Sequence, residues 1–249
     1  MPLLRSPEWR ALRSQMQLIY QDPLAALDRR MAIESQIEEP LDIHNVMTGD
    51  ERRPRLDQLM SRVGLRADQA DRYPHELSGG QRQRVVIARA LVTKPRFLVC
   101  NEPVSALDVS IQAQVVNLLR DLQEQFRLTM VFISHDLKVV RNICDRVMVI
   151  YLGRIVKEAP SDQIFSDPRH PHTRALVSSI PKVGHGLQER IVLEGEPPNP
   201  AHRPPGCAFH PRCAWAGPEC AVTVPPLERH GNRMAACLKL DDALRPAAA

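Results

Sequence analysis

Short apolar runs alternate with amphipathic helical stretches over residues 85–153, and this alternation limits the fold more than any other feature of the chain. "RQRVVIARALV" predicts a helix with one broad apolar face, whereas "RFLVC" and "TMVFIS" predict buried strands. "RVMVIYLG" predicts a third strand, and Leu152-Gly153 predicts a hairpin turn into "RIVKEA". The order strand–helix–strand predicts an α/β fold, with a parallel sheet and helices on both faces.

The rest of the 249 residues flanks this core. We expect one domain over residues 1–158, which includes a charged, mostly helical subdomain at about 27–76. Prolines become frequent in "GEPPNPAHRPPG", and four cysteines follow, so residues 159–240 are expected to form a small extension. Residues 241–249 are expected to be a disordered tail.

Charge and hydropathy exclude several classes of protein. The net charge is only +4 and the basic residues are scattered, so no nucleic-acid partner is expected. No apolar run approaches the ~20 residues that a bilayer-spanning helix needs. We expect the chain in the cytoplasm, docked on a membrane complex. Six cysteines in such a chain favour thiols or metal ligands over disulfides.

The octapeptide "LSGGQRQR" (77–84) predicts a phosphate-binding element. Two glycines follow Ser78 and open a helix, whose free N–H groups and positive dipole end favour an anion. The sequence G-x-x-x-x-G-K-[ST], which cradles phosphates in many nucleotide-binding proteins, is absent from the 249 residues. The rest of the phosphate site is therefore expected to come from another polypeptide.

Several polar residues fall where predicted strands end, and each has a functional and a structural interpretation. Glu102, next to Asn101, either polarises a water beside a phosphate or caps a helix. His135 either contacts a phosphate or is a structural histidine. Gln21 either lies near a metal or a water or caps a turn. Asp108 closes the turn "SALD", and Ser110 is expected to cap the following helix.

Taken in order, these motifs resemble the nucleotide-binding subunit of ATP-binding-cassette (ABC) transporters, from about residue 16 to 156. "YQDP" resembles the glutamine loop, "LSGGQRQR" the signature, "FLVCNEP" the Walker B strand, "SALD" the D-loop and "ISHD" the histidine switch. Further on, "DPRHPHTRALVSSIP", "LEGEPPNP" and "GCAFHPRC" resemble the C-terminal extension of oligopeptide and dipeptide importers. Nickel and other small-solute importers share much of that tail, which leaves the solute open.

The resemblance implies a role for each motif residue in binding and hydrolysing MgATP. Glu102 polarises the attacking water, His135 contacts the γ-phosphate, and Gln21 senses metal and water. Asn101 lies at the metal shell and Asp108 contacts the opposite subunit. The signature residues Ser78, Gly79, Gly80 and Gln81 face an ATP that is held mainly by the partner subunit.

The resemblance also implies the partners of the chain. These are a second ABC ATPase subunit, two transmembrane permease subunits and a periplasmic or extracellular solute-binding protein. The permease's coupling helix is expected on the helical segment 27–73. The implied location is the cytoplasmic face of the bacterial inner membrane, as a peripheral protein.

Two departures from the family bear on activity. Only twenty residues precede Gln21, so the upstream phosphate loop and its strand are missing, either because Met1 is a mis-assigned start or because the gene is truncated. The expected fold is therefore an incomplete P-loop NTPase-like sheet with exposed apolar surface, which folds poorly alone. Asn101 stands where the family has aspartate, which should weaken Mg²⁺ binding. Autonomous ATPase activity is thus in doubt.

Two rival interpretations stay open at this point. The first is a catalytically silent interaction module, or the product of a pseudogene, that contributes only the signature to a partner's ATP site. The second is an ABC ATPase of DNA repair or chromosome maintenance. Those proteins insert long coiled coils between the glutamine loop and the signature, and the interval from Gln21 to Leu77 is too short for one.

The four cysteines of the extension are the candidate metal ligands. Cys207, Cys213, Cys220 and Cys237 are separated by five, six and sixteen residues, which is not the C-x₂-C pairing of zinc ribbons. Some peptide-importer ATPases carry a [4Fe–4S] cluster in this extension, so the resemblance implies one here. Free thiols in a small proline-rich cap are the alternative.

Overall fold

The computed structural model describes residues 6–47, 49–181 and 190–240, and the predicted tail at 241–249 lies outside them. The chain divides into two compact units, residues 1–135 and 136–249. Each unit is described by itself. The domain boundary expected at 158/159 stays a prediction.

The first unit contains a parallel sheet in the order β1-β2-β3. Its strands are β1 (Met16–Ile19), β2 (Phe97–Asn101) and β3 (Thr129–Ile133). Leu18 is in register with Val99, and Val99 with Val131, so their side chains share one face of the sheet. The predicted α/β fold with parallel strands is confirmed.

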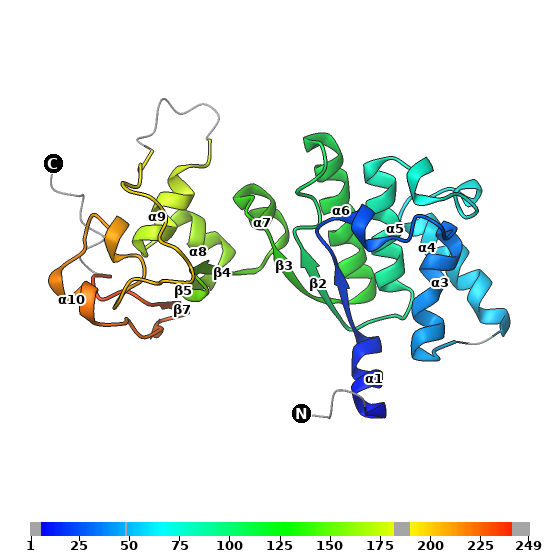
Figure 1. Cartoon of the computed structure of the whole chain (residues 1–249), viewed down its shortest axis with the longest axis horizontal. Helices are drawn as coiled ribbons and strands as arrows, with labels where there is room; N and C mark the ends of the chain where they lie inside the picture. The colour runs from blue at the N-terminus through cyan, green and yellow to red at the C-terminus, as the bar shows by residue number, and fades with distance from the viewer. Residues whose placement is uncertain (1–5, 48, 182–189, 241–249) are drawn as a thin grey trace. The chain divides into compact units, whose positions relative to one another are not determined.

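The described helices of the first unit leave one face of this sheet uncovered (Figure 1). They are α1 (Pro7–Gln15), α2 (Pro23–Ala26), α3 (Ile33–His44), α4 (Arg52–Arg62), α5 (Gly79–Leu91) and α6 (Val109–Phe126), with 3₁₀ turns at Gly49–Glu51, Ala67–Gln69 and Pro74–Glu76. The helix α5 contacts β1 on one side and α3 and α4 on the other. Ile87 of α5 and Leu98 of β2 are both 0% exposed, which places the core of the unit between the sheet and this helix.

The opposite face of the same sheet is open and apolar. Leu18 is 39% exposed, Val131 44% and Ile133 48%, although each belongs to a strand. Alternation explains the pattern, since successive side chains of a strand point to opposite faces and only one face is covered by helices in the described residues. The exposed apolar sheet surface expected from the sequence is therefore present.

The helix α6 begins two residues earlier than the sequence indicated. Its N-cap is Asp108, in extended conformation, so Ser110 lies within the first turn and does not cap the helix. The prediction of Ser110 as the cap was wrong because Asp108 and Ser110 are both good N-cap residues, and the sequence does not say where the preceding turn ends.

The second unit contains an antiparallel sheet in the order β4-β5-β7-β6. Its strands are β4 (Arg146–Tyr151), β5 (Arg154–Pro160), β6 (Glu228–His230) and β7 (Arg233–Ala235). The predicted hairpin is confirmed, and positive φ at both Leu152 and Gly153 matches the two-residue turns that suit twisted hairpins. The prediction that β4 belongs to the parallel sheet was wrong for the described residues, because β4 is hydrogen-bonded only to its hairpin partner β5.

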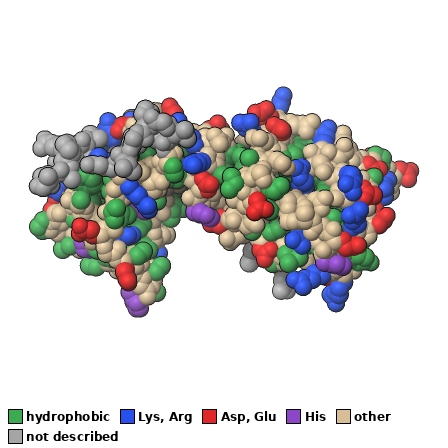
Figure 2. Space-filling model, turned by 90° about the horizontal axis from the view of Figure 1, so that it is seen from above, with side chains coloured by type: hydrophobic (Ala, Val, Ile, Leu, Met, Phe, Trp, Pro, Cys, Tyr) green, Lys and Arg blue, Asp and Glu red, His purple; other side chains and the backbone are tan. Residues whose placement is uncertain are grey.

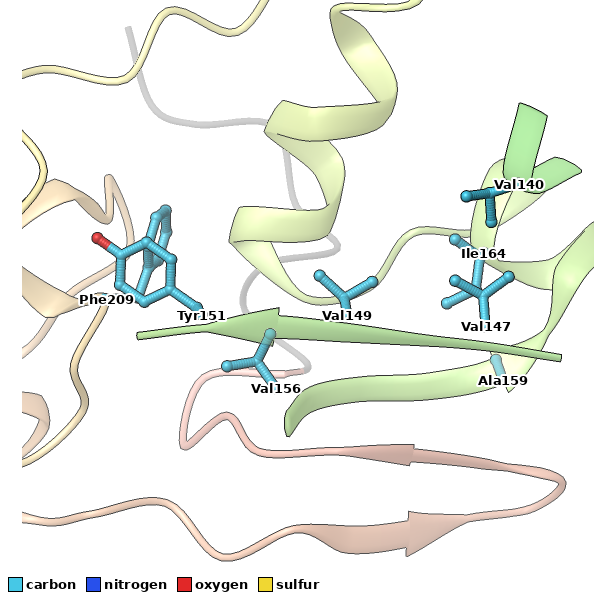
Figure 3. Close-up of a cluster of buried hydrophobic side chains, with 8 residues drawn as sticks. All are labelled: Val140, Val147, Val149, Tyr151, Val156, Ala159, Ile164 and Phe209. Carbon is cyan, nitrogen blue, oxygen red and sulfur yellow. The ribbon is translucent and has the colours of Figure 1, made fainter. Parts of the chain in front are cut away.

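Helices α7 (Leu137–Ile143), α8 (Ser161–Ser166), α9 (Pro171–Ser178) and α10 (Pro218–Val222), with a 3₁₀ turn at His210–Arg212, complete the second unit. One face of β4 packs inward through Val147, Val149 and Tyr151. Figure 3 shows these side chains with Ile164 of α8, while Phe209 lies against Tyr151 at the far end. This cluster forms a closed core for the second unit.

The surface of the chain carries mixed charge. On the face seen in Figure 2, basic and acidic side chains are interspersed and do not gather in one patch of a single sign. Among the described residues, no helix is both long enough and apolar enough to cross a membrane.

Candidate functional site

Three of the predicted site residues meet at the carboxyl edge of the parallel sheet. Gln21 follows β1, Glu102 follows β2 and His135 follows β3. The Gln21 amide Nε2 donates a 2.8 Å hydrogen bond to Glu102 Oε2, and His135 Nδ1 lies 3.3 Å from Glu102 Oε1. Parallel strands bring their carboxyl ends to one edge, which is where ligands bind on such sheets. Both carboxylate oxygens of Glu102 therefore have a polar neighbour from an adjacent strand end.

The backbone of Glu102 is held in an uncommon conformation. Its φ is +46°, in the left-handed region that non-glycine residues seldom adopt. Its N–H donates to the Ile133 carbonyl at 2.9 Å, and its own carbonyl accepts from the Ser105 hydroxyl at 3.1 Å. Such strain persists where surrounding contacts fix it, and it is concentrated at functional sites. The side chain of Glu102 is 25% exposed, so the carboxylate is accessible from the strand ends.

The signature residues form the N-terminus of α5. Ser78 is the N-cap: its hydroxyl accepts from the Gln81 N–H at 3.3 Å, and its own N–H donates to Gln81 Oε1 at 2.9 Å. This capping box fixes the start of the helix. The N–H groups of Gly79 and Gly80 have no partner among the described residues. They remain available to an anion, as the sequence predicted.

Gly80 is also required by packing, which the sequence did not reveal. A Cβ at this position would come within 2.8 Å of the Ile111 Cγ2 on α6, whereas a Cβ at Gly79 would meet Leu107 Cδ2 at an ordinary 3.6 Å. The signature helix thus packs on the D-loop and the start of α6. Among the described residues, no hydrogen bond or ion pair links the signature to Gln21, Glu102 or His135.

A groove of about 760 Å³ lies in the first unit beside the glutamine loop. Gln21 and Asn101 line it together with Tyr20 from the end of β1 and Ile43 from α3. Tyr20 and Ile43 are each 55% exposed. The sequence analysis missed these two residues, because nothing in a helical or strand pattern marks an outward apolar residue as part of a groove.

The described residues supply only part of a MgATP site. No group of three or more His, Cys, Asp or Glu side chains among them is placed to hold a metal ion. Mg²⁺ prefers oxygen ligands. The amide oxygens of Gln21 and Asn101 are candidates, because both residues line one groove, and the carboxylate of Glu102 lies beside Gln21. These residues suit a metal that is bound chiefly by nucleotide phosphates.

The four extension cysteines line one small cavity of the second unit. Burial raises the pKa of Cys207 and Cys213, and raises that of Cys237 to about 11, so these thiols stay protonated at neutral pH. The cavity holds about 10 Å³, which is room for about one water molecule. As a donor set the four thiols suit a metal, but this space does not fit a [4Fe–4S] cluster. Cys100, by contrast, is fully buried in β2 as a core residue.

Comparison with known proteins agrees with the motifs. A family described as "ABC transporter" matches residues 2–105, and "Oligopeptide/dipeptide transporter, C-terminal region" matches residues 156–220. The oligopeptide transport ATP-binding protein OppF of Escherichia coli K12 is 50% identical over 242 residues, which cover 96% of this chain and 72% of OppF. The chain belongs to the ABC transporter family, in its oligopeptide and dipeptide group.

Two further relatives have similar names. AppF of Bacillus subtilis 168, an oligopeptide transport ATP-binding protein, is 51% identical over 219 residues, covering 87% of this chain and 67% of AppF. The dipeptide transport ATP-binding protein DppF of Haemophilus influenzae is 50% identical over 237 residues, covering 94% of this chain and 72% of DppF. The chain thus shares both its ABC part and its extension with this group.

Solved structures of ABC proteins share the fold. CbiO1 from Clostridium perfringens, part of the transporter complex CbiONQ, aligns with a TM-score of 0.57 at 28% identity over 64% of this chain and 62% of its own. The cassette MJ0796, a dimer bound to ADP and Pi, aligns with a TM-score of 0.54 at 30% identity over 61% of this chain and 66% of its own. The parallel sheet with its helices is therefore an ABC ATPase fold.

Proposed function

We propose that this chain is an energy-coupling, ATP-binding subunit of a bacterial peptide importer, on the cytoplasmic face of the inner membrane. The observation that carries the proposal is the convergence of Gln21, Glu102 and His135 at one sheet edge, in a chain that also presents a capped glycine helix start. Relatives named for oligopeptide, dipeptide and di/tripeptide transport support peptides as the solute.

Each residue of the strand-end group has a distinct role in this proposal. Hydrolysis of MgATP supplies the free energy for uptake. Glu102 orients the attacking water and accepts its proton, because its carboxylate is accessible and fixed by the backbone. His135 hydrogen-bonds the terminal phosphate. Gln21 is hydrogen-bonded to Glu102 and also lines the neighbouring groove, so a change in the position of Glu102 would move a side chain of that groove.

The finer part of the proposal concerns where the chain acts. In this part of the proposal the chain contributes Gly79 and Gly80 to a nucleotide held mainly by a second ATP-binding subunit. Free N–H groups on a fixed helix start favour this role. In such a pair, the partner's own catalytic residues act on the shared nucleotide, and Glu102 faces the other site.

A pair of variants separates the two sites. The chain is mixed with a complete partner subunit, and ATP turnover is measured. Gly79→Asp places a carboxylate against the phosphates and should lower turnover at least ten-fold, whereas Gly79→Ala fits the 3.6 Å space beside Leu107 and should have little effect. Glu102→Gln should leave turnover at the shared site intact. If the mixture shows no gain over the partner alone, the shared site does not exist.

The groove beside Gln21 is proposed to receive a cytoplasmic helix of a permease subunit. It lies between the end of β1 and α3, and it exposes Tyr20 and Ile43 next to the glutamine loop. An amphipathic helix would bury these side chains. Ile43→Glu should weaken association with permease-containing vesicles, while Val109→Glu, at an 82% exposed position outside the groove, should not. Periplasmic or extracellular solute-binding proteins complete the proposed system.

For the cysteine-lined cavity, the cluster and the free thiols are both still predictions. The small volume favours free thiols. A brown, oxygen-sensitive preparation would decide for an iron–sulfur cluster, and a colourless protein without metal would decide against it.

A catalytically silent interaction module is the second candidate function. Asn101 in place of aspartate favours it, since an amide lacks the charge that holds a metal shell. Asn101→Asp, tested in the mixture with the partner subunit, distinguishes the two. A rise in Mg²⁺-dependent turnover that Glu102→Gln abolishes would show an active site in this chain, and no change would favour the silent module.

A further inference from the structure

A second cavity, of about 400 Å³, lies wholly within the second unit and has no part in the proposed ATPase chemistry. It lies between the tip of the β4–β5 hairpin, the segment 206–209 and the segment 224–227. Its size is in the range of small-molecule sites.

The inner wall of this cavity is apolar and buried. Val156 is 8% exposed, Phe209 2% and Ala236 7%. Figure 3 shows Phe209 and Tyr151 side by side at the end of β4, with their ring centroids 5.2 Å apart. A ligand that enters would therefore contact aliphatic and aromatic surface, which favours an apolar chain.

The wall is also fixed in place by the backbone. The Cys207 N–H donates to the Cys220 carbonyl at 2.8 Å. Gly206 has φ +64°, and a Cβ there would come within 2.4 Å of the same carbonyl oxygen. Only glycine permits this close approach, so the segment that forms one side of the cavity is held tightly against α10. The cavity is thus a preformed feature.

One cationic side chain, that of Arg154, is among the described residues that line the cavity. The Arg203 guanidinium lies so close to Gly153, another lining residue, that a Cβ there would be 3.0 Å from its Nη2. The side chain of neither arginine forms an ion pair or a hydrogen bond with the described residues. No Asp or Glu is among the described residues that line the cavity.

We infer that this cavity binds a small amphipathic monoanion, with its apolar chain against Phe209 and its carboxylate at Arg154. The absence of lining carboxylates among the described residues disfavours a ligand with a free ammonium group, such as a zwitterionic peptide. A medium-chain carboxylate matches both the apolar wall and the cationic side chain. This is a ligand site in the extension that is separate from nucleotide and solute.

Binding of fatty-acid probes to the full chain tests the inference by calorimetry. Octanoate should bind at least ten-fold more tightly than octanol, and octylamine should not bind. Affinity should rise about four-fold per methylene from butanoate to octanoate, because each added methylene is removed from water. A negative heat-capacity change should accompany binding. Equal affinity for octanoate and octanol, or a flat chain-length series, would overturn the inference.

Matched variants locate the site. Val224→Asp places a negative charge in the lining and should abolish binding, whereas Val222→Asp, at a 78% exposed position outside the lining, should not. Arg154→Glu should weaken the binding of octanoate at least ten-fold, and Arg229→Glu on the exposed strand β6 should leave the binding unchanged.

All four positions are on the surface, so the variants should fold. If Val222→Asp weakens binding as much as Val224→Asp, the ligand binds elsewhere. Leu-Leu dipeptide that binds as tightly as octanoate would refute the monoanion.

Discussion

The candidate site of the first unit and the core of the second unit differ in how exposed their polar residues are. In the first unit the polar site residues lie at accessible strand ends: the His135 side chain is 73% exposed and that of Glu102 25%, while apolar side chains of the sheet remain uncovered. In the second unit Lys157 and His170 are almost fully buried in the described structure, and the apolar core is closed. The strand ends of the first unit are therefore open to a ligand. The second unit has a packed core on one face of β4, and Met148 and Ile150 on the other face are 58% and 61% exposed.

The largest expected effect tests the closed core of the second unit. Ile164 is 0% exposed in that core, so Ile164→Ala should lower the free energy of unfolding by about 2–5 kcal/mol through lost burial and a cavity. Ile150→Ala, at a 61% exposed position on β4, is the control and should change it by less than about 0.5 kcal/mol. Urea unfolding followed by Trp215 fluorescence in a Trp9→Phe background reports this unit alone, since the chain has only these two tryptophans. Similar losses for both variants would contradict a packed core.

Lys157 provides the second test, because its side chain is 0% exposed and its Nζ has no hydrogen-bond partner among the described residues. Burial lowers the pKa of Lys157 from 10.5 to about 8, with Arg233 adding to the shift and Asp167 opposing it. As pH falls from 10.5, the unfolded state takes up the proton first. The folded state therefore loses stability between about pH 10.5 and 8, and it carries the full penalty below pH 8. Lys157→Met should stabilise the second unit by up to about 3 kcal/mol at pH 7.

The gain from Lys157→Met should shrink as pH rises from about 8 to 10.5, where the lysine becomes neutral in both states. Thermal unfolding across this range measures it. A gain that is independent of pH would mean that the lysine is not buried as a charge.

His172 predicts acid lability of the second unit. Burial lowers the pKa of His172 to about 4, so below pH 6.5 the unfolded state binds a proton that the folded state does not. The contribution of His172 to the free energy of unfolding is fully present above pH 6.5 and is lost as pH falls; the loss is about 2 kcal/mol at pH 5. His172→Phe keeps the ring contacts with Tyr151 and Phe209 and should make the profile less steep, which Trp215 fluorescence can follow. The remaining slope is expected from His170, because burial lowers the pKa of His170 to about 3. His230→Phe, on exposed β6, should leave the profile unchanged.

The smallest change in stability is expected on the open sheet face of the first unit. Val131 is 44% exposed on β3, so Val131→Thr should change the free energy of unfolding by less than about 0.5 kcal/mol. It should nevertheless reduce self-association of the 249-residue chain, measured by light scattering, because the uncovered apolar row promotes aggregation. Leu98→Thr on the covered face should instead destabilise the unit. If the unsubstituted chain is monomeric and unfolds cooperatively, the prediction that this exposed face promotes aggregation is wrong.

Local patterns predicted several elements of both units. The strands β2 and β3, the helix start at Ser78 and the hairpin at Leu152-Gly153 all follow from apolar runs, caps and turn residues. The cap of α6 was predicted at Ser110 and lies at Asp108, because two good capping residues are only two positions apart. The burial of Lys157 could not be predicted, since nothing near it in the chain differs from an exposed lysine in a strand.

The sequence by itself determined the elements, the motif order and the family, because periodicity, caps and motif spacing are properties of neighbouring residues. Only the tertiary structure decided that Glu102 meets Gln21 and His135, that Gly80 is required by Ile111, and that Val131 lies on an uncovered face. These facts join residues that are far apart in the chain, or depend on what covers a surface. Their physical basis is packing between elements, and no local pattern encodes it.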